Sequence, residues 1–135
     1  MNGREASMVL DERFDSVTGT WYISLDGEID IYNAPEFKER LHQLIQRQSG
    51  NFVLDCRGLN YIDSTGLGVL ISALRRVKEY GGEIKIQNLK PYLKKIFVIT
   101  GLDKIFTIEV GNHEQWSDNI VCSRQTRIRY DHQTN

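Results

Sequence analysis

Apolar and polar positions along the chain follow two different periods. Five segments either alternate with a period of two or form short continuous apolar runs, and both patterns are typical of strands. These segments are residues 8–14, 21–25, 52–56, 83–87 and 105–108. A polar stretch with one glycine, residues 15–20, separates the first two and predicts an antiparallel hairpin. The run at 52–56 indicates an inner strand that is covered on both faces.

Three other segments carry apolar residues at helical spacing. They run from Asn33 to Ser49, from Thr65 to about Tyr80, and from Pro91 to Ile99. Asn33 and Glu36 have the spacing of a capping box, in which each side chain binds the other residue's backbone N–H, and Pro35 suits a first turn. Glycines after the first two helices predict their ends.

The predicted order is therefore β-β-α-β-α-β-α-β, an α/β fold. After an opening hairpin, strands and helices alternate, which predicts a mixed β-sheet with a parallel centre covered by helices. Residues 8–111 form the predicted domain. Beyond Gly111 the apolar periodicity fades, so we expect residues 112–135 to be a flexible polar tail, with an extra strand or a short helix as the alternative.

Composition narrows the possible functions. A formal net charge of -1 argues against a general nucleic-acid binder and against electrostatic attachment to a membrane. No apolar run approaches the roughly 20 residues that span a bilayer, and the first residues lack the apolar core of a signal peptide. Cys56 and Cys122 have no C-x-x-C spacing and are expected to be unpaired thiols in the cytoplasm. The three histidines are scattered, so we expect no metal site, and no cofactor motif is present.

The most informative stretch is residues 61–68, between the inner strand and the second helix. In an open α/β sheet, loops that leave the carboxyl ends of parallel strands line the functional edge. Ser64 falls at or next to the predicted N-cap, where its hydroxyl could accept a hydrogen bond from a backbone N–H. Gly66 and Gly68 leave the first turn without side chains, so another protein could approach closely, at a cost of about 1 kcal/mol each relative to alanine.

Two interpretations of this stretch stay open on local pattern. In the first, Asp63, Ser64 and Thr65 form a strong capping sequence with small residues for tight packing. In the second, the serine is functional, but the motifs of aspartic proteases, nucleophile elbows and P-loops are all incomplete here. A serine with no general base nearby in sequence is a poor nucleophile and a good substrate. Because a helix N-terminus favours an anion, the helix should tolerate a phosphate on Ser64.

Four motifs together resemble a known family. They are Gly27-Glu28-Ile29-Asp30, the run from Asn60 to Val69 that contains Asp63-Ser64-Thr65-Gly66-Leu67-Gly68, Gly81-Gly82, and Thr100-Gly101-Leu102. In this order they resemble the STAS-domain anti-sigma factor antagonists of bacteria, over residues 8–110. The resemblance implies the STAS fold, whose element order matches the one predicted above.

The resemblance also implies a partner-switching protein that is not an enzyme. In that family the unphosphorylated antagonist binds an anti-sigma factor, which is also a GHKL-type serine kinase, and so releases the sigma factor. The kinase phosphorylates the antagonist, which ends binding, and a PP2C-type phosphatase reverses the step. On this sequence the phosphorylated residue is Ser64. The implied partner-binding residues are Asp30, Asp63, Ser64, Thr65, Gly66, Leu67 and Gly68.

Alternatives to this function keep the fold and change the partner. A STAS module in a scaffold or regulatory assembly would bind partners unrelated to sigma factors. A STAS domain that binds nucleotides or other small molecules has little support, because no phosphate-cradling motif is present. Tyr32 and Tyr61 near the motif are interpreted as partly exposed packing residues.

Overall fold

The computed structural model describes residues 7–109 and 120–129. The strands are β1 (Ser7–Asp15), β2 (Thr20–Ile29), β3 (Asn51–Ile62), β4 (Ile84–Gln87), β5 (Thr107–Glu109) and β6 (Ile120–Arg129). The helices are α1 (Ala34–Arg47), α2 (Ser64–Lys78) and α3 (Pro91–Ile99), with a short 3-10 helix η1 (Leu102–Lys104). The predicted α/β class and element order are confirmed up to β5.

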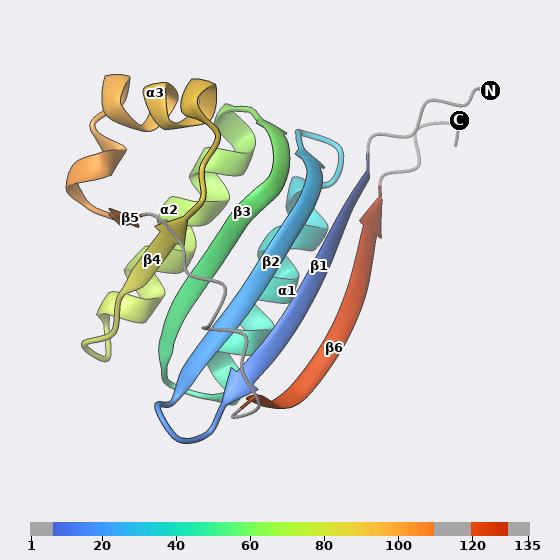
Figure 1. Ribbon diagram of the computed structural model, residues 1–135, viewed down its shortest axis with the longest axis vertical. Helices are drawn as coiled ribbons and strands as arrows, with labels where there is room; N and C mark the ends of the chain where they lie inside the picture. Colours follow the sequence, from blue (N-terminus) through green and yellow to red (C-terminus); the bar gives the residue numbers. More distant parts are fainter. Residues whose placement is uncertain (1–6, 110–119, 130–135) are drawn as a thin grey trace.

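The strands form one mixed sheet in the order β5-β4-β3-β2-β1-β6. The four strands β2 to β5 run parallel, and β1 lies antiparallel to both β2 and β6. Helices α1 and α2 lie side by side on one face of this sheet, and α3 lies beyond the end of β4 (Figure 1). The parallel centre therefore brings the carboxyl ends of β2, β3 and β4 to the same end of the molecule as α3.

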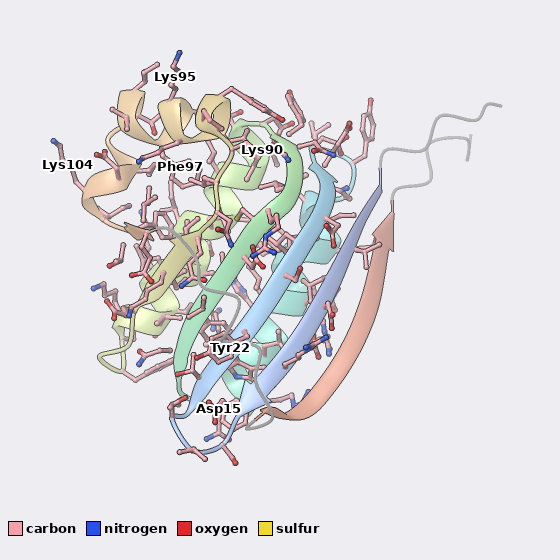
Figure 2. All side chains as sticks on the ribbon, viewed as in Figure 1. Asp15, Tyr22, Lys90, Lys95, Phe97 and Lys104 are labelled. Atoms are coloured by element: carbon pink, nitrogen blue, oxygen red, sulfur yellow. The ribbon has the colours of Figure 1, made fainter. Side chains whose placement is uncertain are left out.

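The core fills the space between the sheet and the two helices. Alternate strand residues point toward the helices, and those of β2 are Trp21, Ile23 and Leu25, each at most 2% exposed. Phe37 and Leu41 of α1 meet them from the other side. Figure 2 shows the same division in α3, where Phe97 points inward while Lys95 points away from the protein. The period-two and helical patterns in the sequence arise from this burial.

Strand β3 is longer than the sequence pattern indicates. Residues 57–62 were expected in a loop, but they continue the strand because β2 also extends to Ile29 and provides a partner. Two register shifts accompany this pairing, and Gly27, at φ 109°, lies at one of them. A side chain at Gly58 would collide with Asp26. Polar residues and glycines in an irregular ladder resemble a loop in sequence. Only Asp63 separates β3 from α2.

The start of α1 also differs from the expectation. Asn33 is the N-cap, but its side chain makes no capping hydrogen bond, so the predicted capping box with Glu36 does not form. The amide of Asn33 instead accepts a hydrogen bond from the Asp30 N–H and donates one to the Glu28 carbonyl. This side chain therefore holds the turn between β2 and α1 rather than the helix end.

Part of the expected tail is structured. Ile120–Arg129 forms strand β6, which pairs with β1 along nearly its whole length (Figure 1). The expectation of a flexible tail was wrong for this segment, and the alternative of a further strand holds. Its apolar residues are too sparse to indicate a strand alone, but an edge strand needs only one hydrogen-bonded neighbour. The rest of the tail lies outside the described residues.

Candidate functional site

The candidate site lies where β3 meets α2, at the carboxyl end of a central parallel strand. Ser64 is the first residue of α2, and both Ser64 and Thr65 are exposed. The preceding residue, Asp63, is half-buried and has an extended backbone. Because β3 stays paired with β2 as far as Ile62, which lies opposite Ile29, the sheet fixes the position of this helix start.

Asp63 is the residue that caps α2. The Gly66 N–H donates to Asp63 Oδ1 at 3.0 Å, and the Leu67 N–H donates to the Asp63 carbonyl at 2.9 Å. A cap residue must have a non-helical backbone, which Asp63 has, whereas Ser64 is already in the helix. The side-chain acceptor for the helix cap, which the sequence pattern predicted to be the Ser64 hydroxyl, is therefore the carboxylate of Asp63. The fold does not need the Ser64 hydroxyl for the cap.

The second carboxylate oxygen of Asp63 reaches a different part of the chain. The Ile31 N–H donates to Asp63 Oδ2 at 3.1 Å, and the Asp63 N–H donates to the Ile29 carbonyl at 3.1 Å. Asp30 holds the same turn, because its Oδ1 accepts hydrogen bonds from the N–H groups of Tyr32 and Asn33. Asp30 and Asp63 are therefore brought together around the β2–α1 turn, and both carboxylates bind backbone N–H groups.

The two glycines of the motif are in opposite environments. Gly66 is buried, and a Cβ atom there would lie 2.7 Å from Ile62 Cγ1 and 2.8 Å from Ile29 Cγ2. Gly68 is exposed, and nothing lies within 4 Å of a Cβ atom built on it. Leu67 is part of the core. Of the seven predicted partner-binding residues, the exposed ones are Ser64, Thr65 and Gly68.

Several exposed apolar residues around this helix start were not among the predicted site residues. We call Ile31, Tyr32, Tyr61 and Tyr92 the apolar collar, and each is about half exposed, between 49% and 59%. The Tyr92 hydroxyl donates to the Asn60 carbonyl, which brings the first turn of α3 against the end of β3. For Ile31, Tyr32 and Tyr61 the available signal was a large apolar residue outside the predicted helices and strands, whereas Tyr92 falls within the predicted helix 91–99.

Charge along α2 is unevenly distributed. Its basic residues, Arg75, Arg76 and Lys78, all lie in the last turn, and its first turn contains no acidic residue. Ser64 is at the N-terminal end of α2, which is the positive end of the helix dipole. His42 of α1 lies 3.3 Å from the hydroxyl of Ser72, in the middle of α2. Burial lowers the pKa of His42, and the charges of Arg76 and Lys38 lower it further.

Cys56, in β3, is buried and unpaired. The described residues contain no group of three His, Cys, Asp or Glu side chains that could hold a metal ion. Burial, and secondarily the charge of Asp55, raises the pKa of the Cys56 thiol, which keeps it protonated and unreactive. Among the helices of residues 7–109, none combines the length and the apolar character needed to cross a membrane.

Comparison with known proteins gives the family. The family model of the STAS domain matches residues 13–115. The chain belongs to the STAS domain family. This STAS domain is 40% identical, over 86 residues, to the anti-sigma-B factor antagonist of Bacillus subtilis (strain 168), covering 64% of this chain and 78% of that protein. It is 37% identical, over 92 residues, to the anti-sigma-B factor antagonist of Listeria monocytogenes serovar 1/2a, covering 68% and 79%.

A solved structure supports the fold of this STAS domain. The Bacillus cell fate determinant SpoIIAA in its phosphorylated form superposes with a TM-score of 0.61 and 20% sequence identity. The match covers 78% of this chain and 94% of SpoIIAA. The STAS fold expected from the sequence motifs is thus confirmed.

Proposed function

We propose that this STAS domain is an anti-sigma factor antagonist and that phosphorylation of Ser64 switches its binding off. The relatives described above carry that name at 37–40% identity. The observation that carries the assignment of the site is the position of Ser64. Its side chain is exposed at the start of α2, while Asp63 makes the cap.

The proposed cycle has two states. Unphosphorylated protein binds an anti-sigma factor, which is also a GHKL-type serine kinase, and this frees the sigma factor. The kinase transfers the γ-phosphoryl group of ATP to Ser64 Oγ, with ADP as the leaving group and the hydroxyl proton passing to a base of the kinase. A PP2C-type phosphatase hydrolyses the phosphoserine and restores the binding state. All three proteins would meet in the bacterial cytoplasm.

The local structure favours a switch that acts on binding and leaves the fold intact. A phosphoserine adds about -1.5 to -2 charges at pH 7. At the start of α2 this charge meets the positive end of the helix dipole, an interaction that typically stabilises by about 0.3–1 kcal/mol. The phosphate also projects from an exposed residue, so no core contact has to move. We therefore expect the phosphorylated protein to remain folded.

The test uses the serine-kinase anti-sigma factor of the same bacterium with Mg²⁺-ATP. The intact mass of the wild type should rise by one phosphate, and that of Ser64→Ala should not. Thr65→Ala is the matched control, because it removes the neighbouring hydroxyl and leaves that of Ser64, and its mass should rise as in the wild type. The unphosphorylated protein should co-elute with the kinase, and the phosphorylated protein should not.

Two results would contradict the proposal. Stoichiometric phosphate on Ser64→Ala would place the modification elsewhere. Failure of the wild type to bind the anti-sigma factor, together with formation of large stable homo-oligomers, would favour the alternative function of a STAS scaffold that binds partners unrelated to sigma factors.

A further inference from the structure

Exposed aliphatic side chains gather where α3 ends and η1 follows. Ile99 is 82% exposed, more than any other large apolar side chain among the described residues, and Val98 and Ile105 are 53% and 46% exposed. Leu93 and Phe97 occupy the inward face of α3, so Val98 and Ile99 fall on its outer face. Because an amphipathic helix normally carries polar residues on that face, this group marks an interaction surface.

The charge around these side chains is strongly positive. Residues 90–105 contain four lysines and one acid, a net charge of +3 in a chain whose formal net charge is -1. Figure 2 shows Lys95 and Lys104 pointing away from the protein. Within residues 7–109 and 120–129, no ion pair includes any of the four lysines. We call the exposed apolar and basic residues together the α3 corner: Lys94, Lys95, Val98, Ile99, Lys104 and Ile105.

The α3 corner projects from the molecule on a packed base. Helix α3 and η1 together form one corner of the molecule, beyond the end of β4 (Figure 1). Gly101, at φ 80°, makes the turn between them, and the rings of Phe97 and Phe106 pack edge to face with their centroids 6.1 Å apart. The corner is therefore accessible to a flat, extended surface, and the core beneath it fixes its shape.

The residue types at the α3 corner suit a lipid surface better than a protein. Protein interfaces are enriched in aromatic side chains and arginine and depleted of lysine, and their energy is concentrated in Trp, Tyr and Arg. The α3 corner consists of aliphatic side chains and lysines. At a membrane, aliphatic groups enter the boundary between headgroups and acyl chains, while lysine stems extend their ammonium groups to lipid phosphates.

The net charge of the chain does not oppose such a contact. Attraction to a charged surface falls off within a Debye length of about 10 Å at 0.1 M salt, so the surface responds to the charges next to it. The acidic excess lies outside residues 90–105. The expectation drawn from net charge, which averages over the whole chain, therefore does not apply to this corner.

We propose that the α3 corner is a peripheral membrane contact, in which Val98, Ile99 and Ile105 enter the headgroup boundary of an anionic bilayer and the lysines bind its phosphate groups. A lysine next to an anionic leaflet typically strengthens binding about fivefold, so a few of them give a weak, reversible attachment. This contact is separate from the proposed function, because the α3 corner shares no residue with the partner-binding residues expected around Ser64.

The first experiment measures co-sedimentation of the full chain with vesicles. Vesicles of equal parts phosphatidylglycerol and phosphatidylcholine should bind the protein at least about tenfold more tightly than vesicles of phosphatidylcholine alone, which lack the anionic charge. Binding to the anionic vesicles should fall as KCl is raised, since salt screens the lysines. Absence of binding to anionic vesicles, or equal binding to both kinds, would overturn the proposal.

The second experiment makes the same charge change in two places. Lys95→Glu combined with Lys104→Glu should weaken binding to anionic vesicles at least about 25-fold, because two lysines at about fivefold each are lost. Lys38→Glu combined with Lys78→Glu is the matched control, because these lysines are exposed on α1 and α2 and the net charge changes equally. The control should bind within about threefold of the wild type. Equal losses would show that overall charge, not the corner, causes binding.

The third experiment tests the apolar part of the contact. Ile99→Ser should weaken vesicle binding about fivefold or more, because a buried aliphatic group is lost. Val17→Ser is the matched control, since Val17 is 77% exposed in the turn between β1 and β2, and it should bind within about twofold of the wild type. Thermal unfolding should be unchanged in both variants. Unaltered binding by Ile99→Ser would show that no side chain is inserted.

A protein is the alternative occupant of this surface. The variant with Lys95→Glu and Lys104→Glu should bind the anti-sigma factor kinase as tightly as the wild type in calorimetry. Loss of that affinity, together with absence of vesicle binding, would overturn the proposal and assign the α3 corner to a protein interface. If the wild type binds anionic vesicles and no kinase, the proposed function is wrong and the membrane contact stands.

Discussion

Gly66 and Gly68 look alike in the sequence motif, but the structure requires glycine only at Gly66. At Gly66 the close approach of Ile29 and Ile62 leaves no room for a side chain, so glycine is a packing requirement between α2 and the sheet. At Gly68 the space is open, so packing does not require glycine there. The sequence suggested that both residues were left bare for a partner. Only Gly68 is in a position to serve one.

Alanine substitution at the two glycines should have opposite effects on stability. Gly66→Ala forces a methyl group against two core isoleucines and should cost about 1–3 kcal/mol. Gly68→Ala removes backbone freedom from an exposed helical position and should stabilise by up to about 1 kcal/mol. Urea unfolding of the two variants measures both changes. Equal shifts in the same direction would show that the close approach at Gly66 does not limit its side chain.

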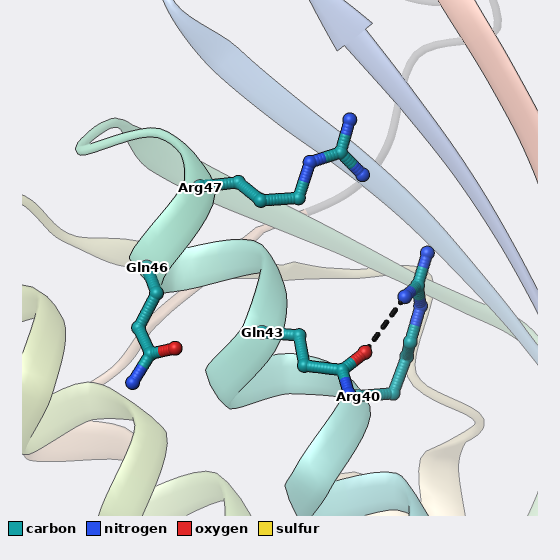
Figure 3. Close-up of a pocket in the computed structure, with 4 residues that line it drawn as sticks. All are labelled: Arg40, Gln43, Gln46 and Arg47. Atoms are coloured by element: carbon teal, nitrogen blue, oxygen red, sulfur yellow. Dashed lines mark hydrogen bonds between the residues drawn. The ribbon is translucent and has the colours of Figure 1, made fainter.

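At the scale of elements, a buried ion pair joins β1 to α1. Glu12 is fully buried on the helix-facing side of β1, and Arg40 Nε donates to its Oε2 at 2.9 Å. Arg40 also donates to Gln43 Oε1 at 2.8 Å, as Figure 3 shows. The two partners are unequal, because the Arg40 side chain is 13% exposed and keeps a second partner, whereas Glu12 has no access to solvent.

Removing the two charges should therefore have unequal costs. Arg40→Leu leaves a buried carboxylate without its cation and should destabilise by about 3–5 kcal/mol. Glu12→Leu leaves Arg40 close to water and to Gln43, so it should cost less, about 1–3 kcal/mol. A double-mutant cycle by urea unfolding checks this, and the double variant should lose clearly less than the sum of the two. Additive losses would mean that the pair contributes no coupling energy.

At the scale of the whole molecule, β6 decides which strand forms the edge of the sheet. It pairs with β1 on the side away from β2, so β1 becomes an interior strand. Without β6 the backbone N–H and C=O groups on that side of β1 would be unpaired. An exposed edge strand is a template for pairing with another chain.

Removal of residues 110–135 should leave a folded but self-associating protein. The helices and strands β1 to β5 that enclose the core all remain, while β1 becomes the new edge. Light scattering should show oligomers that increase with concentration, and the melting temperature should fall. Val9→Lys in the shortened chain, a charge on a half-buried β1 residue, should restore the monomer. A shortened chain that is monomeric at all concentrations would contradict this role of β6.

The sequence by itself determined the α/β class, the element order up to β5 and the position of Ser64 at a helix start. Local burial periodicity and turn residues carry this information, because a strand or helix records in its own residues which face it buries. Family motifs added the STAS fold. The sequence did not reveal the full length of β3, since polar residues and glycine in an irregular ladder have no regular period.

Only the tertiary structure decided which residues far apart in the chain are in contact. Asp63 caps α2 and also holds Ile31, which lies 32 residues earlier, and no local pattern encodes that bond. The pairing of β6 with β1, the ion pair of Glu12 with Arg40, and the gathering of the apolar collar have the same origin. Local periodicity records that a residue is buried or exposed, while its partner depends on how the elements are brought together by folding.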